Sequence, residues 1–300
     1  MQIERLKVFI DVAECRSFTR AAERGYISQS AVSQQIAALE RELGAALLLR
    51  DRKGNVSLTA EGEVFYRGCV KVVDAYEKTV MQVRNIREGD KEVIFLGMVA
   101  GSDDKWLSEV LSAFVRRCPG VRVMPTYDSF IGLRRGLESG RLDAAVAVCY
   151  DLEDIDSVVC EPLLELQSVA LVSNQSPLAR QEEMRAVDLK DEYLITTSEA
   201  YGPASFRHWM EERRREGYEP KLREAVDSAE TLRLLVEINA GIAIVPSYMR
   251  HDKEKCSTVR LVGTEDRVPY VIAHRTVGVS EALKIFIALT KEHFAHFTEG

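Results

Sequence analysis

Long hydrophobic runs, an export signal and closely paired cysteines are all missing from this sequence of 300 residues. No window of about 18 apolar residues occurs, so we expect no membrane-spanning helix and no membrane partner. The first residues (MQIERLKVF) carry charge at once and show no apolar core or small-residue cleavage site, which predicts a cytoplasmic protein. None of the six cysteines has the two-residue spacing of a zinc or dithiol motif, so we expect free thiols and no metal site.

Signatures of catalysis are missing as well. The patterns G-x-S-x-G, G-x-G-x-x-G, H-E-x-x-H and the P-loop do not occur, which argues against an enzyme and against a bound cofactor. Among the five histidines only His293 and His296 lie at a ligand-like spacing, and we interpret them as surface residues. Apolar residues at 46% and charged residues at 29% are ordinary for a folded protein and exclude intrinsic disorder.

The net charge of −7 conceals an asymmetry along the chain. Residues 1–91 hold 15 basic and 13 acidic side chains, whereas residues 92–300 hold 25 basic and 34 acidic ones. A mildly basic N-terminal module on an acidic body fits a DNA-binding head whose body is repelled by the phosphates.

Residues 1–60 carry the pattern of a winged helix-turn-helix. Apolar residues on one face predict a helix over 5–15. Ser17 and Ser28 are suitable N-caps for helices over 18–24 and 29–43, and Gly44 ends the latter. Two short strands over 47–58 predict a hairpin wing.

The helix predicted over 29–43 is the most informative segment. Its apolar stripe is Val32, Ile36, Leu39 and Leu43. The opposite face has short polar side chains and no acid: Gln29, Ser30, Ser33, Gln34 and Ala37. Glutamine bonds an adenine edge at two atoms, serine reaches a base or a phosphate, and small residues let a helix enter the major groove. The alternative is a solvated helix face, but such faces usually carry Glu and Lys.

Phosphate contacts are expected on both sides of this helix. Ser28 at the helix start presents backbone amides that suit a phosphate, and basic residues in the wing suit the DNA backbone or the minor groove. The candidate DNA-binding residues are Ser17, Thr19, Arg20, Ser28, Gln29, Ser30, Ser33, Gln34, Arg50, Arg52 and Lys53.

A long helix is predicted over about 60–87. Apolar positions repeat at nearly heptad spacing: Phe65, Cys69, Val72, Tyr76, Thr79, Val83 and Ile86. This stripe either packs against its own domain or forms a two-helix coil with a second copy. We favour the dimer, because the sequence on both sides already forms self-contained modules.

Beyond residue 91 strands and helices alternate. The order strand-helix-strand-helix-strand over 93–148 predicts a parallel sheet with helices on both faces. The expected strands are 93–98, 121–127, 142–148, 163–172, 193–197, 241–246 and 268–273. The expected helices are 106–117, 131–139, 204–216, 229–239 and 280–296.

Several segments closely resemble the LysR-type transcriptional regulators. In the head these are SFTRAAE at 17–23, ISQSAVS at 27–33, QI at 35–36, LE at 39–40, ELG at 42–44 and LTAEG at 58–62. Less specific matches follow in the expected order: PGV at 119–121, LESGRLD at 137–143, PLA at 177–179, VDS at 226–228 and AGIAIVP at 240–246.

The resemblance implies an α/β protein with an N-terminal winged helix-turn-helix (1–60), a long linker helix (61–90) and an effector domain of the periplasmic-binding-protein type (91–300). Subdomain I would comprise 91–161 and 266–300, and subdomain II 162–265, with crossings near Cys160–Pro162 and Thr264–Arg267. The implied function is DNA-binding transcriptional regulation controlled by a small-molecule effector bound between the subdomains. Implied partners are an interrupted palindrome of double-stranded DNA near a promoter, the effector, further copies in a homodimer or homotetramer, and RNA polymerase.

Departures from the family pattern affect three places, one of which is Leu48 and Leu49 in place of the usual Phe and polar pair. Gly25 stands where the family usually has Leu, and Tyr26 is expected to fill that gap. In the first effector loop Val99 and Gly101 stand where Ser or Thr is frequent, followed by Ser102, Asp103 and Asp104. Ser102 either caps the next helix, with the acids in its first turn, or the acids make a site for a neutral or cationic ligand instead of the usual carboxylate.

Strand ends that face one crevice supply further effector candidates. The full set is Gly101, Ser102, Asp103, Ser129, Phe130, Val148, Cys149, Ser198 and Tyr201. Phe130 and Tyr201 could sandwich an apolar ligand, although each could equally be loop packing. We interpret His208 and Trp209 as packing residues. Rival functions are an exported solute-binding protein, a redox switch using Cys149 and Cys160, and an architectural DNA binder without a ligand.

Overall fold

A computed structural model describes residues 2–50, 56–87, 89–264 and 267–296. The chain divides into two compact units, Met1–Val83 with Ser139–Arg141, and Arg84–Glu138 with Leu142–Gly300. No helix among the described residues has the length and hydropathy needed to cross a membrane.

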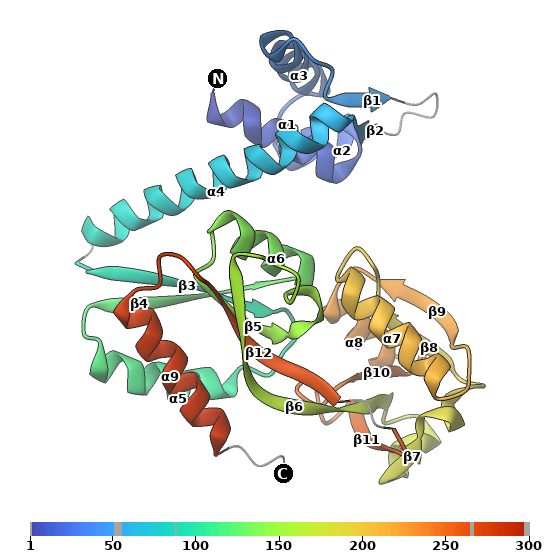
Figure 1. Cartoon of the computed structure of the whole chain (residues 1–300). Coiled ribbons are helices and arrows are strands. Elements are labelled where there is room, and N and C mark those ends of the chain that lie inside the picture. Colours follow the sequence, from blue (N-terminus) through green and yellow to red (C-terminus); the bar gives the residue numbers. More distant parts are fainter. Residues whose placement is uncertain (1, 51–55, 88, 265–266, 297–300) are drawn as a thin grey trace. The chain divides into compact units, whose positions relative to one another are not determined.

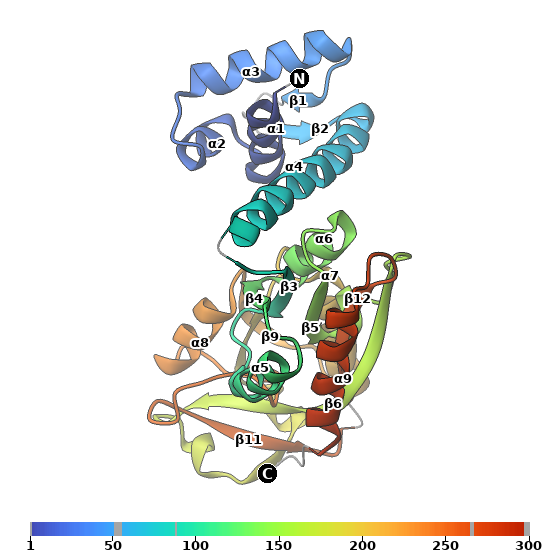
Figure 2. The same ribbon diagram turned by 90° about the vertical axis from the view of Figure 1, so that its left-hand side faces the viewer.

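The first unit is a winged helix-turn-helix followed by a long helix (Figure 2). Its elements are α1 (Ile3–Cys15), α2 (Phe18–Arg24), α3 (Gln29–Leu43), β1 (Leu48–Arg50), β2 (Val56–Leu58) and α4 (Ala60–Arg87). The predicted caps are confirmed: the hydroxyls of Ser17 and Ser28 accept backbone N–H groups of α2 and α3, and Gly44 ends α3 with a φ of 66°. The core joins all three helices, the wing and the start of α4.

The apolar stripe of α4 is buried in the head at its start and exposed to solvent further along the helix. Phe65 and Cys69 pack into the core of the head, where the Phe9 and Phe65 rings lie 5.4 Å apart. Val72, Tyr76 and Val83 are instead exposed, by 52%, 50% and 55%. The sequence predicted a single seam, but its first part packs against its own domain and only the later part is available to a partner.

The second unit is built on a mixed sheet (Figure 1). Among the described residues the strand order is β4-β3-β5-β12-β6-β11-β7, with β10 also paired to β6, and β8 pairs with β9 separately. The strands are β3 (Glu92–Val99), β4 (Val121–Asp128), β5 (Ala144–Val148), β6 (Val158–Ser173), β7 (Glu183–Arg185), β8 (Tyr193–Thr197), β9 (Lys221–Val226), β10 (Ala243–Pro246), β11 (Cys256–Val262) and β12 (Arg267–Arg275). The parallel sheet predicted over 93–148 is confirmed for β3, β4 and β5, and β12 joins it antiparallel to β5 and β6.

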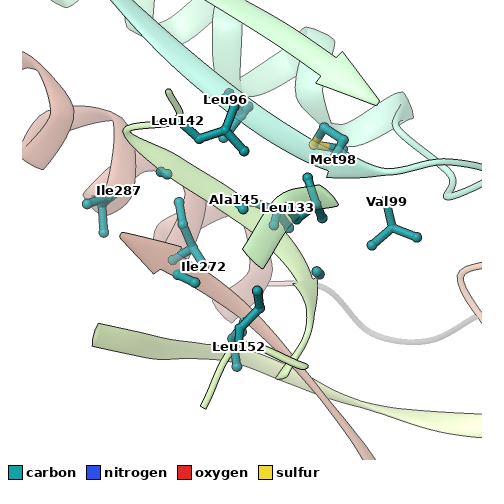
Figure 3. Close-up of a cluster of buried hydrophobic side chains, with 14 of the residues drawn as sticks. Leu96, Met98, Val99, Leu133, Leu142, Ala145, Leu152, Ile272 and Ile287 are labelled. Carbon is teal, nitrogen blue, oxygen red and sulfur yellow. The ribbon is translucent and has the colours of Figure 1, made fainter. Parts of the chain in front are cut away.

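Helices flank both parts of this sheet. They are α5 (Lys105–Arg117), α6 (Phe130–Ser139), α7 (Pro203–Arg215), α8 (Ala229–Glu237) and α9 (Glu281–Ala295), with short 3-10 turns η1 (Cys149–Asp151), η2 (Pro177–Arg180) and η3 (Ala186–Leu189). Helices α5 and α9 pack together through Phe114 and Phe286, whose rings meet edge to face at 5.6 Å. Figure 3 shows part of the hydrophobic core of this unit, where Leu96, Ala145 and Ile272 come from neighbouring strands.

Strand β6 carries the chain from one lobe of this unit to the other (Figure 1). Its residues up to Gln167 pair with β12, and its residues from Ser168 pair with β10 and β11. The expected crossing at Cys160–Pro162 is therefore too early, because those residues lie opposite Val271 to Ala273 within β12. The second expected crossing, at 264–267, includes residues 265 and 266, which lie outside the described residues.

Candidate nucleic-acid interface and effector pocket

Helix α3 presents the predicted acid-free face at the surface of the head. The side chains of Val32, Ile36 and Leu39 are at most 2% exposed to solvent. The side chains of the opposite face are exposed or, for Ser33, half-buried: Gln29, Ser30, Ser33, Gln34 and Ala37. Amphipathicity fixes this orientation, because rotating the helix would expose its apolar stripe. The polar face is therefore available to a DNA major groove.

Both serine caps are engaged in local hydrogen bonds. The Ser28 hydroxyl accepts the Ala31 N–H at 3.1 Å and lies 2.9 Å from the Ser30 hydroxyl. The Ser17 hydroxyl accepts the Arg20 N–H at 3.3 Å. Thr19 and Arg20 are exposed in the first turn of α2. The two N-termini are thus fixed in geometry, with Thr19 and Arg20 beside them.

The turn between α2 and α3 differs from the expectation. Tyr26 does not fill the space beside Gly25, since its side chain is 96% exposed and its φ is 52°. A Cβ at Gly25 would lie 3.3 Å from the Ala21 carbonyl and 3.6 Å from Ile27. Ile27 is therefore the neighbour of Gly25, and Tyr26 is left on the surface of the turn.

The wing is fastened to α3 by a residue that sequence reasoning missed. The Glu40 carboxylate accepts the N–H groups of Leu47 and Leu48 at 2.8 and 3.3 Å. No local pattern in the sequence indicates this contact between Glu40 and the wing. The guanidinium of Arg50, which is exposed, lies 3.9 Å above the Phe18 ring. Arg52 and Lys53 lie outside the described residues.

Replacing Arg50 with Ala is expected to weaken binding to all DNA alike. An exposed guanidinium held on an aromatic ring would suit a phosphate, and phosphate contacts carry no sequence information. The slope of log affinity against log salt should fall by about one phosphate's worth. Fluorescence anisotropy across a salt series measures this, with Arg50→Lys as the control that keeps the charge. An unchanged slope for Arg50→Ala would exclude the phosphate contact.

A pocket lies between the two lobes of the second unit and encloses about 100 Å³. One wall comes from the ends of β3 and β5 with η1, and the other from β8, β10, α7 and α8. Tyr150 and His208 stack across it at 4.0 Å, with the tyrosine oxygen 2.9 Å from His208 Nε2. The indole N–H of Trp209 donates to the Ile244 carbonyl at 3.0 Å, which fixes the ring in the wall.

Three of the nine predicted effector residues lie in this wall: Phe130, Val148 and Tyr201. The expected sandwich is not formed, because the Phe130 and Tyr201 rings contact each other edge to face at 5.6 Å. The Tyr201 hydroxyl donates to the Ala100 carbonyl at 3.2 Å, and burial raises the pKa of that hydroxyl above its usual range. This pair closes one side of the pocket.

The remaining predicted residues line other parts of the structure. Ser102 does not cap α5, since its hydroxyl donates to the Val99 carbonyl at 2.7 Å and the N-cap position belongs to Asp104. The hydroxyls of Ser129 and Ser198 accept N–H groups of their own turns. Gly101, Asp103 and Cys149 are also absent from the described pocket wall. Gly101 has a φ of 83° and faces α8 so closely that a Cβ would lie 2.7 Å from the Ala229 Cβ.

Sequence reasoning missed most of the polar wall. Ser205, His208 and Trp209 lie at i, i+3 and i+4 on α7, so they share one helix face, and that spacing was a usable signal. His208 and Trp209, interpreted from the sequence as packing residues, also line the pocket, and Trp209 does pack against the core. Ser168 enters the wall because β6 crosses between the lobes at that point, which the sequence does not reveal, and Thr196 enters it from β8.

The redox alternative loses support from the state of the two thiols. Mainly because the thiols are buried, the pKa of Cys149 is raised well above its usual range and the pKa of Cys160 is raised to about 11. A protonated thiol is a poor nucleophile for peroxide, because the thiolate is the reactive form.

A helix-turn-helix head on the same chain as a two-lobed unit with an internal pocket defines a class, the ligand-responsive DNA-binding regulators. Residues 3–63 match the family model described as "Bacterial regulatory helix-turn-helix protein, lysR family", and residues 87–295 match "LysR substrate binding domain". The chain belongs to the LysR family of DNA-binding transcriptional regulators, in which the second domain binds a small-molecule effector.

Similar proteins span the whole chain. The Hca operon transcriptional activator HcaR of Escherichia coli (strain K12) is 27% identical over 308 residues, covering 99% of this chain and 100% of that protein. The regulator AlsR of Bacillus subtilis (strain 168) is 24% identical over 291 residues, covering 97% and 95%. CbnR in complex with its target DNA shares the fold, with a TM-score of 0.62 at 22% identity over 98% of this chain and 100% of that one. Full-length BenM also shares the fold, with a TM-score of 0.59 at 24% identity, covering 100% of this chain and 99% of that one.

Proposed function

We propose that this chain regulates transcription by placing α3 of each copy in the major groove at an interrupted palindrome near a promoter. The observation that carries the proposal is the exposed, acid-free face of α3 over residues 29–37. Gln29 and Gln34 would read base edges, the N-terminus of α3 at Ser28 and the wing at Arg50 would hold phosphates, and Thr19 and Arg20 would contact the backbone beside them.

Regulation would pass through the pocket of the second unit. We place the head at 1–60, the linker at 61–90 and the effector domain at 91–300, as the sequence suggested. A ligand shifts the equilibrium between lobe arrangements only by its difference in affinity for them. The exposed stripe of α4 would join two copies, and RNA polymerase would be the further partner at the promoter. We also propose that the protein acts without catalysing a reaction and that it works in the cytoplasm, where chromosomal DNA lies.

Replacing Gln29 with Ala tests the base-reading role. The variant should lose about 1–3 kcal/mol of binding free energy on its own operator and little on random DNA. A gel shift with the DNA that flanks its own gene, against a shuffled sequence, measures both. Gln35→Ala is the matched control, because it removes the same amide from a half-buried position of the same helix. Equal losses on both DNAs would refute base reading at Gln29.

A further inference from the structure

The N-terminus of α7, which faces the pocket, is already occupied by a carboxylate of the same chain. Asp151 in η1 accepts the Ala204 N–H through Oδ1 at 2.9 Å and the Ser205 N–H through Oδ2 at 3.0 Å. The Ser205 hydroxyl donates to the same Oδ2. The α7 N-cap, Gly202, makes no side-chain cap bond of its own. These amide donors are the groups that a helix N-terminus normally offers to a bound anion.

The carboxylate is held tightly in place. Asp151 is only 3% exposed, and a Cβ at Gly202 would lie 2.9 Å from its Oδ2 and 2.7 Å from the Phe130 ring. The absence of a side chain at Gly202 therefore lets η1 and α7 approach each other. Because η1 follows β5 and α7 follows β8, this contact joins the two lobes at the pocket.

The rest of the pocket presents few ionisable side chains to a ligand. Among the described residues that line it there is no Lys, Arg, Asp or Glu. The described wall contains one imidazole, that of His208, and its Nε2 atom is hydrogen-bonded to the Tyr150 hydroxyl. A ligand carboxylate that did not displace Asp151 from α7 would find no Lys or Arg among the described residues of the wall, and burying a charge without such a partner is costly. A buried ammonium would equally find no carboxylate in the wall.

The walls suit a flat, largely apolar molecule. Tyr150, His208 and Trp209 supply rings, and Val99, Leu232 and Ile244 supply aliphatic surface. Thr196 and Thr197 also line the wall, and each carries a hydroxyl group. We propose that Asp151 acts as a built-in carboxylate at the N-terminus of α7, so that the pocket takes an uncharged, ring-bearing effector. This inference rests on the proposed role of the pocket as the effector site.

The test compares three probes of nearly equal shape: benzamide, benzoate and benzylamine. Isothermal titration of the full-length wild-type protein without DNA should give benzamide an affinity at least about tenfold above those of benzoate and benzylamine. Asp151→Ala should raise the affinity for benzoate by about tenfold or more, because the Ala204 and Ser205 amides become available. Asp188→Ala is the matched control, since it removes a helix-capping carboxylate at an exposed site in η3 and should leave the preference unchanged.

Equal or tighter binding of benzoate or benzylamine by the wild type would overturn the proposal, as would Asp151→Ala without any gain for benzoate. Asp151→Asn guards against a variant that fails to fold. It keeps an oxygen for the Ala204 amide and should still favour benzoate more than the wild type does. The proposed function is read separately, by the sequence preference of the unliganded protein in the gel shift. If the protein showed no DNA sequence preference but kept its selectivity among the three probes, the proposed regulatory function would be refuted and the proposal about the pocket would not.

Discussion

Aspartate at both Val72 and Val83 is expected to convert the protein to monomers and to lower operator affinity by about a hundredfold or more. These residues are 52% and 55% exposed on one face of α4, an area of apolar surface that a second copy would bury. Four carboxylates facing one another across a two-fold interface repel and lose their solvation. Separated heads also lose the effective concentration that joins two half-site contacts, typically a factor of about 10² to 10⁴.

Sedimentation velocity and anisotropy on full and half operators measure the two effects. Met81→Asp is the control, because Met81 is 44% exposed but lies about 200° around the helix from Val83. That variant should remain dimeric with unchanged operator affinity. Persistent dimers of the doubly substituted protein would show that the copies associate through another surface.

The head could be predicted almost residue by residue, because its signals are local. Ser17 and Ser28 cap their helices and Gly44 ends α3 as the sequence indicates, since each acts within one helical turn. Strands β7 and β9 were missed for the opposite reason. β9 (Lys221–Val226) is exposed along nearly its whole length, so it shows no apolar pattern, and β7 has three residues. β11 alternates buried and exposed side chains, and its period of two was a signal that went unused.

The pocket could be predicted only in part, because its wall is assembled from distant segments. Phe130, Val148 and Tyr201 follow from the rule that ligands bind at strand ends, and they do lie in the wall. Asp151 caps a helix that begins about fifty residues further along the chain, so no local spacing connects them. Asp103 was predicted as an effector residue because it lies beside the start of α5 in the sequence. Its carboxylate instead accepts the Lys105 N–H and lies outside the pocket wall.

Replacement of Gly62 with Ala is expected to unfold the head while the effector unit stays folded. A Cβ at Gly62 would lie 2.0 Å from the Leu47 carbonyl oxygen and 3.0 Å from its carbon, and both are backbone atoms that no rotamer change can move. Leu47 itself is 1% exposed within the core of the head. Either α4 separates from the wing or the wing strands shift, so we expect a cost of about 3 kcal/mol or more.

The same helix provides the control for this prediction. Gly68 has no atom of another part of the described chain within 4 Å of an added Cβ, so Gly68→Ala should change stability by at most about 1 kcal/mol, in the stabilising direction. Thermal unfolding followed by circular dichroism should show an early transition for Gly62→Ala only, together with loss of operator binding. Probe binding should persist, because Gly62 belongs to the first unit and every pocket residue to the second. An unchanged melting curve would mean that the contact between α4 and the wing is looser than these distances imply.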